Sequence, residues 1–189
     1  MSTIFAIRKD IPKYQILDLD VLDVTRNLPD DIDLDSVFDF SQLNTPLAQW
    51  WETPETRFVG VDNPGSEIPD ISCWVDASLV LSPKAYRLLK DSLAAIGEFL
   101  PVNVDNQLHY IFNCFQLADE DDEKSKFNIE EGLASGLKHL EFREDSSNLL
   151  LFKSKAENCL TLFCNQRFKE IVNSFALGGV IFDEQLIIA

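Results

Sequence analysis

The sequence predicts an α+β fold, in which a mixed, largely antiparallel sheet is packed by a few helices. The order strand, capped helix, strand occurs twice, at 78–115 and at 160–182, and short apolar runs bounded by turn residues fill much of the remainder. The 189 residues are 46% hydrophobic and 25% charged, which is ordinary for a globular protein. We expect an acidic α/β lobe over residues 1–66 and a core over 67–189, or one continuous domain.

The first unit begins with the apolar run Ser78–Leu81, which predicts a strand. Ser82 is suited to cap a helix with its hydroxyl, and Pro83 at the first helical position gives up only an N–H that has no helical partner. Gly97 is expected to end this helix in the left-handed conformation. Apolar residues recur at the spacing of one buried helix face: Ala85, Leu88, Leu89 and Ile96.

The second unit repeats this layout near the end of the chain. Leu160–Phe163 is apolar, Asn165 is a suitable N-cap, and Gly178–Gly179 precede a predicted strand at Val180–Phe182. The intervening helix is expected to bury a face formed by Phe168, Ile171, Val172 and Phe175.

The remaining elements are shorter. Apolar or alternating patterns predict strands at Ile4–Ile7, Tyr14–Asp23, Phe58–Val61 and Leu149–Phe152. Pro46 opens either a short helix or a loop. The charged run Asp119–Lys126 predicts an exposed loop, and the glycines that follow it, Gly132 and Gly136, argue against a long helix there.

The charge of the chain is its least ordinary property. The net charge is −16 and the pI is about 4.3, and the basic residues do not cluster. Such a field repels nucleic acid and anionic lipid surfaces and attracts a basic partner. We therefore expect neither a nucleic-acid-binding nor a membrane-binding protein.

Eight aspartates lie between Asp18 and Asp39, opposed by Arg26 alone: Asp18, Asp20, Asp23, Asp30, Asp31, Asp33, Asp35 and Asp39. The run from Asp31 to Asp35 resembles the start of a calcium-binding loop. Ser36 stands where that loop needs glycine, and Gln42 stands where it needs a bidentate glutamate. A solvated acidic face without a metal is the better interpretation.

The chain contains none of the common phosphate-binding or hydrolase motifs. Its two histidines, His109 and His139, lie in strand-like contexts that favour structural roles. The four cysteines form no CxxC pair and mostly lie in apolar runs, so free buried thiols in a reducing cytosol are expected. The sequence shows neither a signal peptide nor a membrane-spanning run, and we predict no catalytic set, no metal site and no cofactor.

Two blocks of the sequence carry short motifs, LVLSPKAYRLLKDSLAAIGEFLPVNVDNQLHYIFNC and NQRFKEIVNSFALGGVIFDE. The first resembles the core pattern, and the second the terminal helix and strand, of the Imm11-type immunity protein family of polymorphic and secreted bacterial toxin systems, including those of type VI secretion. Leu117-Ala118-Asp119 departs from the Leu-Asp element that often follows. The pattern falls on Pro69, Asp70, Val80, Ser82, Gly97, Glu98, Pro101, Asn113, Gly179 and Phe182.

The resemblance implies a cytoplasmic protein that binds a cognate toxin in the producing cell and inhibits it stoichiometrically, by covering its active site or substrate groove, without catalysing a reaction. The acidic body suits a basic toxin. Two alternatives stay open, a small hydrolase using Cys or His chemistry and an acidic adaptor for another basic partner. The candidate contact residues are Asp30, Asp31, Asp33, Asp35, Asp39, Trp50, Trp51, Asp119, Glu120, Asp121, Asp122 and Glu123.

Overall fold

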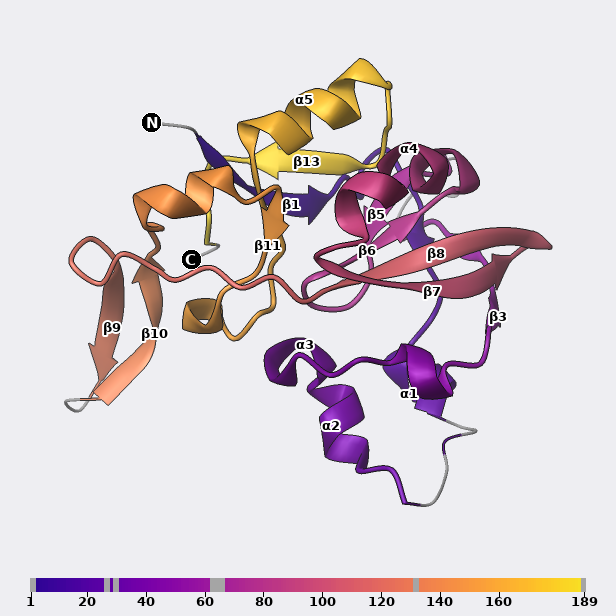
Figure 1. Cartoon of the computed structure of the whole chain (residues 1–189), viewed down its shortest axis with the longest axis horizontal. Coiled ribbons are helices and arrows are strands. Elements are labelled where there is room, and N and C mark those ends of the chain that lie inside the picture. Colours follow the sequence, from indigo (N-terminus) through magenta and orange to yellow (C-terminus); the bar gives the residue numbers. More distant parts are fainter. Residues whose placement is uncertain (1–2, 26–27, 29–30, 62–66, 131–132, 188–189) are drawn as a thin grey trace.

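A computed structural model describes residues 3–25, 28, 31–61, 67–130 and 133–187, and it confirms the α+β class with mixed, largely antiparallel sheets. Two main sheets form the body, helices pack on both of them, and a two-stranded arm stands apart (Figure 1).

The larger sheet has five strands in the order β3-β7-β8-β6-β5, and only the β3–β7 pair is parallel. Two residues, Asp105 and Asn106, join β7 to β8, and both have positive φ (50° and 65°), as a tight hairpin of this twist requires. The strand bounds are Glu55–Thr56 for β3, Ile71–Cys73 for β5, Ser78–Leu81 for β6, Gly97–Val104 for β7 and Gln107–Cys114 for β8.

The smaller sheet joins the two ends of the chain. Its order is β11-β12-β1-β13, and every pairing in it is antiparallel. Residues 4–9 therefore share a sheet with the C-terminal strands. The strand bounds are Ile4–Lys9 for β1, Leu151–Phe152 for β11, Phe163–Asn165 for β12 and Val180–Asp183 for β13.

The two capped helices are α4 (Pro83–Leu93) and α5 (Gln166–Ser174). The predicted caps are confirmed: Ser82 Oγ accepts from Ala85 N at 3.1 Å, and Asn165 Oδ1 accepts from Phe168 N at 3.1 Å. Both helices contribute to one apolar core between the sheets, with buried residues Ala85, Leu89, Leu93, Phe168 and Val172. The prediction that Phe175 is buried is wrong, because it follows the end of α5 and is 44% exposed.

The expected ending of the first helix at Gly97 is also wrong. Helix α4 stops at Leu93, and Gly97 is the first residue of β7. A Cβ on Gly97 would lie 2.3 Å from the backbone oxygen of Asn113, so the glycine is needed for close approach of β7 to β8.

The N-terminal helices cover the other face of the five-stranded sheet. A second apolar core joins Val37, Phe40 and Leu47 to sheet residues such as Leu100 and Ile111. These helices lie below the sheet in Figure 1, and their bounds are Val21–Thr25 for α1, Leu34–Phe38 for α2, Phe40–Leu43 for α3 and the 3-10 turn Ala48–Trp50 for η1.

The strand predicted over Tyr14–Asp23 is mostly wrong. Within it, Ile16–Leu17 forms a strand (β2) that pairs with Phe58–Val59 (β4), and Tyr14 makes an isolated bridge to Glu67. The Asp20 carboxylate accepts from Leu22 N at 2.8 Å and so turns the chain into α1. An aspartate at a helix start satisfies a free N–H there, and this local bond outweighs the alternating pattern.

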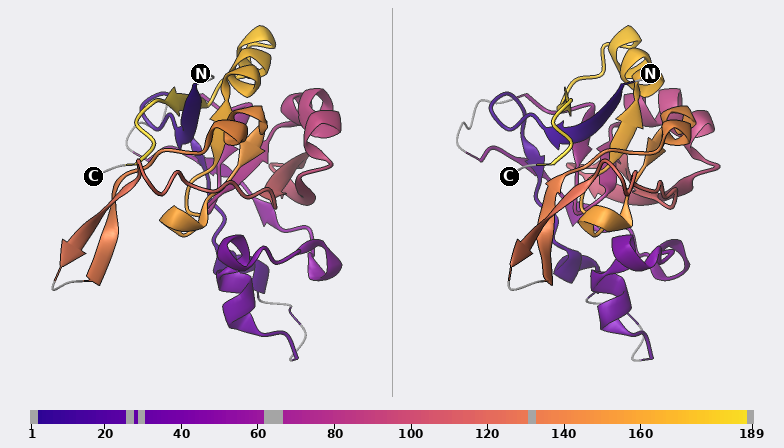
Figure 2. Two further views of the ribbon diagram at one scale, coloured as in Figure 1. Left: turned by 60° about the vertical axis from the view of Figure 1, so that its left-hand side comes forward. Right: turned by 90° about the vertical axis from the view of Figure 1, so that its left-hand side faces the viewer.

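The segment after the acidic loop forms a hairpin that stands away from both sheets (Figure 2). It consists of β9 (Lys126–Glu130) and β10 (Leu133–His139). Two 3-10 turns follow, η2 (Glu144–Asn148) and η3 (Lys155–Glu157), and a third apolar cluster around Phe142, Phe152 and Phe163 lies near the base of the hairpin.

Candidate protein-binding surface

Glu98 and Asn113 fasten the N-terminal helices to the sheet. They lie opposite each other on β7 and β8, and Asn113 Nδ2 donates to Glu98 Oε1 at 2.9 Å and to the Thr45 carbonyl at 3.2 Å. The Glu98 carboxylate also accepts the backbone N–H groups of Leu47 (2.7 Å) and Ala48 (3.1 Å), where η1 begins. Bonds to an ionised acceptor are stronger than neutral ones, so this pair fixes the segment that follows α3.

A buried lysine makes a second attachment. Lys153 is fully buried, and its Nζ donates to the Ser41 carbonyl of α3 at 2.5 Å. Ser41 Oγ donates to the Cys159 carbonyl at 2.8 Å, and Asn44 Nδ2 donates to the Phe115 carbonyl at 2.9 Å. Burial lowers the pKa of Lys153, since the charged amine is poorly solvated there. Helix α3 is therefore held to the body by several side chain–backbone hydrogen bonds.

The attached helices present an exposed face that is both acidic and apolar. Val37 and Phe40 are fully buried, whereas Leu34, Phe38 and Leu43 are 50%, 39% and 60% exposed. Asp33 caps α2 by accepting from Asp35 N at 3.2 Å. We call this face the acidic helical surface, and it consists of Asp31, Asp33, Leu34, Asp35, Phe38, Asp39 and Leu43, all of them exposed.

Among the described residues, no cation neutralises the carboxylates of this surface. In the described part of the chain, no lysine, arginine or histidine lies at ion-pair distance from Asp31, Asp33, Asp35 or Asp39. Residues 16–61 contain ten carboxylates and two arginines, which is half of the chain's net charge of −16. The predicted contact residue Asp30 lies outside the described residues.

The second predicted acidic site is arranged differently. Lys124 pairs with Asp121 (3.0 Å) and Glu141 (3.2 Å), and Arg143 pairs with Asp122 (3.4 Å) and Asp119 (3.8 Å). Ion pairs with Lys124 and Arg143 thus hold the run from Asp119 to Glu123 against the base of the hairpin. Glu120 and Glu123 remain as carboxylates for which no cation is in reach among the described residues.

The two candidate tryptophans are used mainly in packing. Trp50 and Trp51 are half-buried against the five-stranded sheet. The Trp51 indole N–H donates to the Pro101 carbonyl at 2.8 Å, and its ring meets Trp74 edge-on at 6.2 Å. The structure therefore places Leu34, Phe38 and Leu43, which the sequence analysis did not single out, as the exposed apolar groups beside the aspartates. The sequence signal that could have found this surface is the i, i+4 spacing of Leu34 and Phe38 among acidic residues.

The thiols lie in environments opposite to those of nucleophilic cysteines. All four are free, and burial raises the pKa of Cys73 and Cys114 to about 11 each. His109 is buried and stacks edge-on against Phe58, and burial lowers its pKa. His139 lies 3.7 Å from Glu141 at the base of the hairpin.

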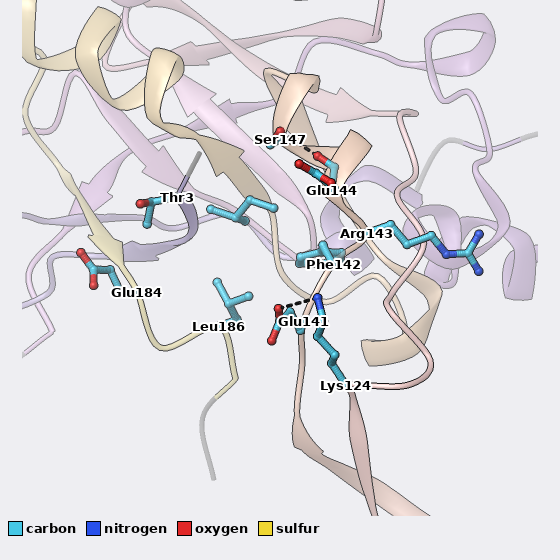
Figure 3. Close-up of a pocket in the computed structure, with 10 residues that line it drawn as sticks. Thr3, Lys124, Glu141, Phe142, Arg143, Glu144, Ser147, Glu184 and Leu186 are labelled. Carbon is cyan, nitrogen blue, oxygen red and sulfur yellow. Dashed lines mark hydrogen bonds and ion pairs between the residues drawn. The ribbon is translucent and has the colours of Figure 1, made fainter. Parts of the chain in front are cut away.

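A cavity of about 310 Å³ opens between the chain ends and the 141–147 segment (Figure 3). Its lining includes the apolar residues Ile4, Phe142 and Leu186. Lys124 reaches its rim but is bonded to Glu141, and the Arg143 guanidinium points away from it (Figure 3). The cavity thus adjoins the internally paired acidic loop and is separate from the acidic helical surface.

The described residues contain no group of three or more His, Cys, Asp or Glu side chains arranged to hold a metal ion. Among them there is also no helix of sufficient length and hydrophobicity to cross a membrane. The sequence matches no model of a known protein family and no curated protein, so the similarity to Imm11-type proteins rests on the short motifs alone.

Proposed function

We propose that this protein is an immunity-type inhibitor that binds a basic effector protein through the acidic helical surface. The observation that carries the proposal is a set of four aspartates, with no cationic partner in the described part of the chain, around three exposed apolar side chains. Unpaired carboxylates speed capture of a basic partner, and apolar side chains supply the desolvation energy that holds it.

The attachment of this surface supports the same function. Glu98, Asn113 and Lys153 hold α3 and η1 in one position, so less conformational freedom is lost when a partner binds. Two of the motif positions, Glu98 and Asn113, act in this attachment. The motif that suggests the family thus serves to position the acidic helices.

Inhibition by this surface would be stoichiometric. A toxin that acts on nucleic acid or another anionic substrate needs a basic groove, and an acidic helical surface docked there excludes the substrate by charge and by volume. Cytoplasmic location in the producing cell follows from this role, since the effector must be captured where it is made.

The two alternatives differ in what supports them. A Cys or His hydrolase is disfavoured by the raised pKa values of Cys73 and Cys114 and by the burial of His109. An acidic adaptor for another basic partner would use the same surface, and the identity of the partner distinguishes it from an inhibitor.

Co-expression with the product of the neighbouring effector gene tests the proposal. We expect rescue of growth and co-purification of the two proteins in equal amounts. If the effector stays toxic and the two proteins do not associate, the inhibitor role is refuted. If they associate without rescue, the adaptor is favoured instead.

A further inference from the structure

We propose that a second cavity, at the end of β1, binds a small zwitterion: an α-amino acid with an apolar side chain, whose carboxylate meets Lys9 and whose ammonium group meets Asp76. This site is independent of the effector, because it uses neither the acidic helical surface nor the acidic loop.

The cavity has the size and part of the character of a small-molecule site. Its volume is about 400 Å³, and it is lined by the end of β1, the turn between β5 and β6, and residues 160–162. Ligand sites commonly have volumes of this order. Ile11 and Leu160 contribute to the lining and are 41% and 52% exposed. A ligand with an apolar part would remove some of their surface from water.

Two charges of opposite sign line this cavity without partners. Lys9 and Asp76 are both half-buried. In the part of the chain that the structure describes, neither side chain makes a hydrogen bond or an ion pair, whether with the other or with a third residue. Arg8, by contrast, is bonded to Asp183 at 3.0 Å. A partly desolvated charge is costly, and a ligand that brings the opposite charge offsets that cost.

The Cys73 thiol shows that the Lys9 ammonium group lies at this cavity. Cys73 Sγ donates to the Ile7 carbonyl at 3.7 Å, so the thiol lies against β1. Ile7 and Lys9 point to the same side of that strand, since side chains alternate. Burial raises the pKa of Cys73 to about 11, and the Lys9 charge opposes this shift. The ammonium group is therefore close to a thiol that lines the cavity.

Asp76 is held in an unusual conformation at the same cavity. Its φ is 49°, in the left-handed region that residues other than glycine seldom adopt. Burial raises the pKa of Asp76, although the buried Lys153 ammonium group opposes the shift, and Asp39 adds to it. A strained backbone and a desolvated carboxyl group that face one cavity are typical of a binding site.

The pair of unpartnered charges selects the class of ligand. A simple carboxylate would satisfy Lys9 and leave Asp76 desolvated, and a simple amine would do the reverse. A zwitterion satisfies both groups at once, and an apolar side chain on it can cover Ile11 and Leu160. An α-amino acid such as L-leucine has these three features, and analogues that lack one charge should be rejected.

Titration of the full-length, nitrogen-15-labelled protein tests this by nuclear magnetic resonance. The three probes are L-leucine, 4-methylpentanoate, which lacks the ammonium group, and 3-methylbutylamine, which lacks the carboxylate. We expect saturable shifts of amide signals around the cavity with L-leucine, at a Kd of about 1 mM or below. Each of the other two compounds should bind about tenfold more weakly or worse.

Two variants separate the roles of the charges. Asp76→Asn keeps a side chain that tolerates the left-handed backbone, and it should weaken L-leucine about tenfold without weakening 4-methylpentanoate. Lys9→Met keeps an apolar stem, and it should weaken L-leucine without weakening 3-methylbutylamine. Asp105→Asn is the matched control, because Asp105 has a φ of 50° in the exposed β7–β8 turn. It should leave the affinity for L-leucine unchanged.

An absence of saturable shifts when L-leucine is added to the natural protein would overturn the proposal. Equal affinity for the three compounds would also overturn it, and so would variants that bind L-leucine as well as Asp105→Asn does. Unchanged dispersion of the amide spectrum establishes that each variant is folded. If Asp76→Asn does not fold, the comparison of the three compounds on the natural protein still decides the matter.

Discussion

Asn113 lies opposite Glu98 across β7 and β8, and its side-chain amide donates to the Glu98 carboxylate over 2.9 Å. This pair does more than join two strands, because the same carboxylate accepts two backbone N–H groups from the segment at Leu47 and Ala48. The acidic helices are thus positioned by residues of the sheet.

Replacement of Glu98 by alanine should therefore destabilise the protein. Leu47 N–H and the Asn113 amide would lose an ionised acceptor in a half-buried site, which costs about 2–4 kcal/mol of unfolding free energy. Urea denaturation of the natural protein and of the variant measures this loss of unfolding free energy. Glu55 provides the control, since it also accepts from an asparagine amide (Asn103, 2.7 Å) but at an exposed site. Equal losses for Glu98→Ala and Glu55→Ala would contradict this account.

Lys153 gives a pH-dependent signature. Its folded-state pKa is lowered by burial, so between that value and 10.5 the unfolded chain binds more protons than the folded one. The stability of the natural protein relative to Lys153→Met should rise as the pH increases toward 10.5, with the neutral amine still able to donate to Ser41. Denaturation of both proteins at several alkaline pH values checks this. A difference in unfolding free energy that stays constant with pH would argue against a desolvated amine.

Glu157 predicts the opposite trend at lower pH. Burial in η3 raises the pKa of Glu157 from 4.5 to about 7, although its carboxylate accepts from Thr161 N at 3.0 Å. The contribution of this group to stability is full below pH 4.5 and is lost as the pH rises through 7, by about 1–3 kcal/mol. Glu157→Gln should remove that part of the pH dependence in thermal or urea unfolding. A parallel pH profile for the variant would show that Glu157 titrates normally.

The cysteines should react slowly in the folded protein. Cys114, Cys159 and Cys164 are buried, Cys73 is half-buried, and burial raises the pKa of each thiol. A thiol-specific chromogenic reagent at pH 8 should modify them rapidly only after unfolding. Fast, selective labelling of one cysteine under native conditions would instead favour the hydrolase alternative.

The sequence was sufficient to predict those features that depend on residues close together along the chain. The caps at Ser82 and Asn165 were predictable because a hydroxyl or amide oxygen satisfies an N–H three residues away. The role of Gly97 was not predictable in this way. It depends on the Asn113 carbonyl, sixteen residues distant along the chain, which leaves no room for a Cβ at Gly97.

The candidate site shows the same division. Both acidic runs are visible in the sequence, but only the structure shows that Lys124 and Arg143 neutralise much of one run. The burial of Lys153 likewise has no local signal, because the Ser41 carbonyl that accepts from it lies in a distant helix. Long-range partners of charged residues are what sequence patterns leave out.

The affinity for the effector of charge variants at the two acidic sites tests the central claim most directly. Asp31→Asn/Asp35→Asn/Asp39→Asn removes three carboxylates of the acidic helical surface and spares the Asp33 cap, whereas Glu120→Gln/Glu123→Gln removes two charges of the other acidic run that no cation reaches among the described residues. Titration calorimetry at several salt concentrations should show the first variant weakened about tenfold or more, with a reduced salt dependence, and the second nearly unchanged. Natural affinity in the triple variant, or a larger loss in the control, would contradict the assignment of this surface.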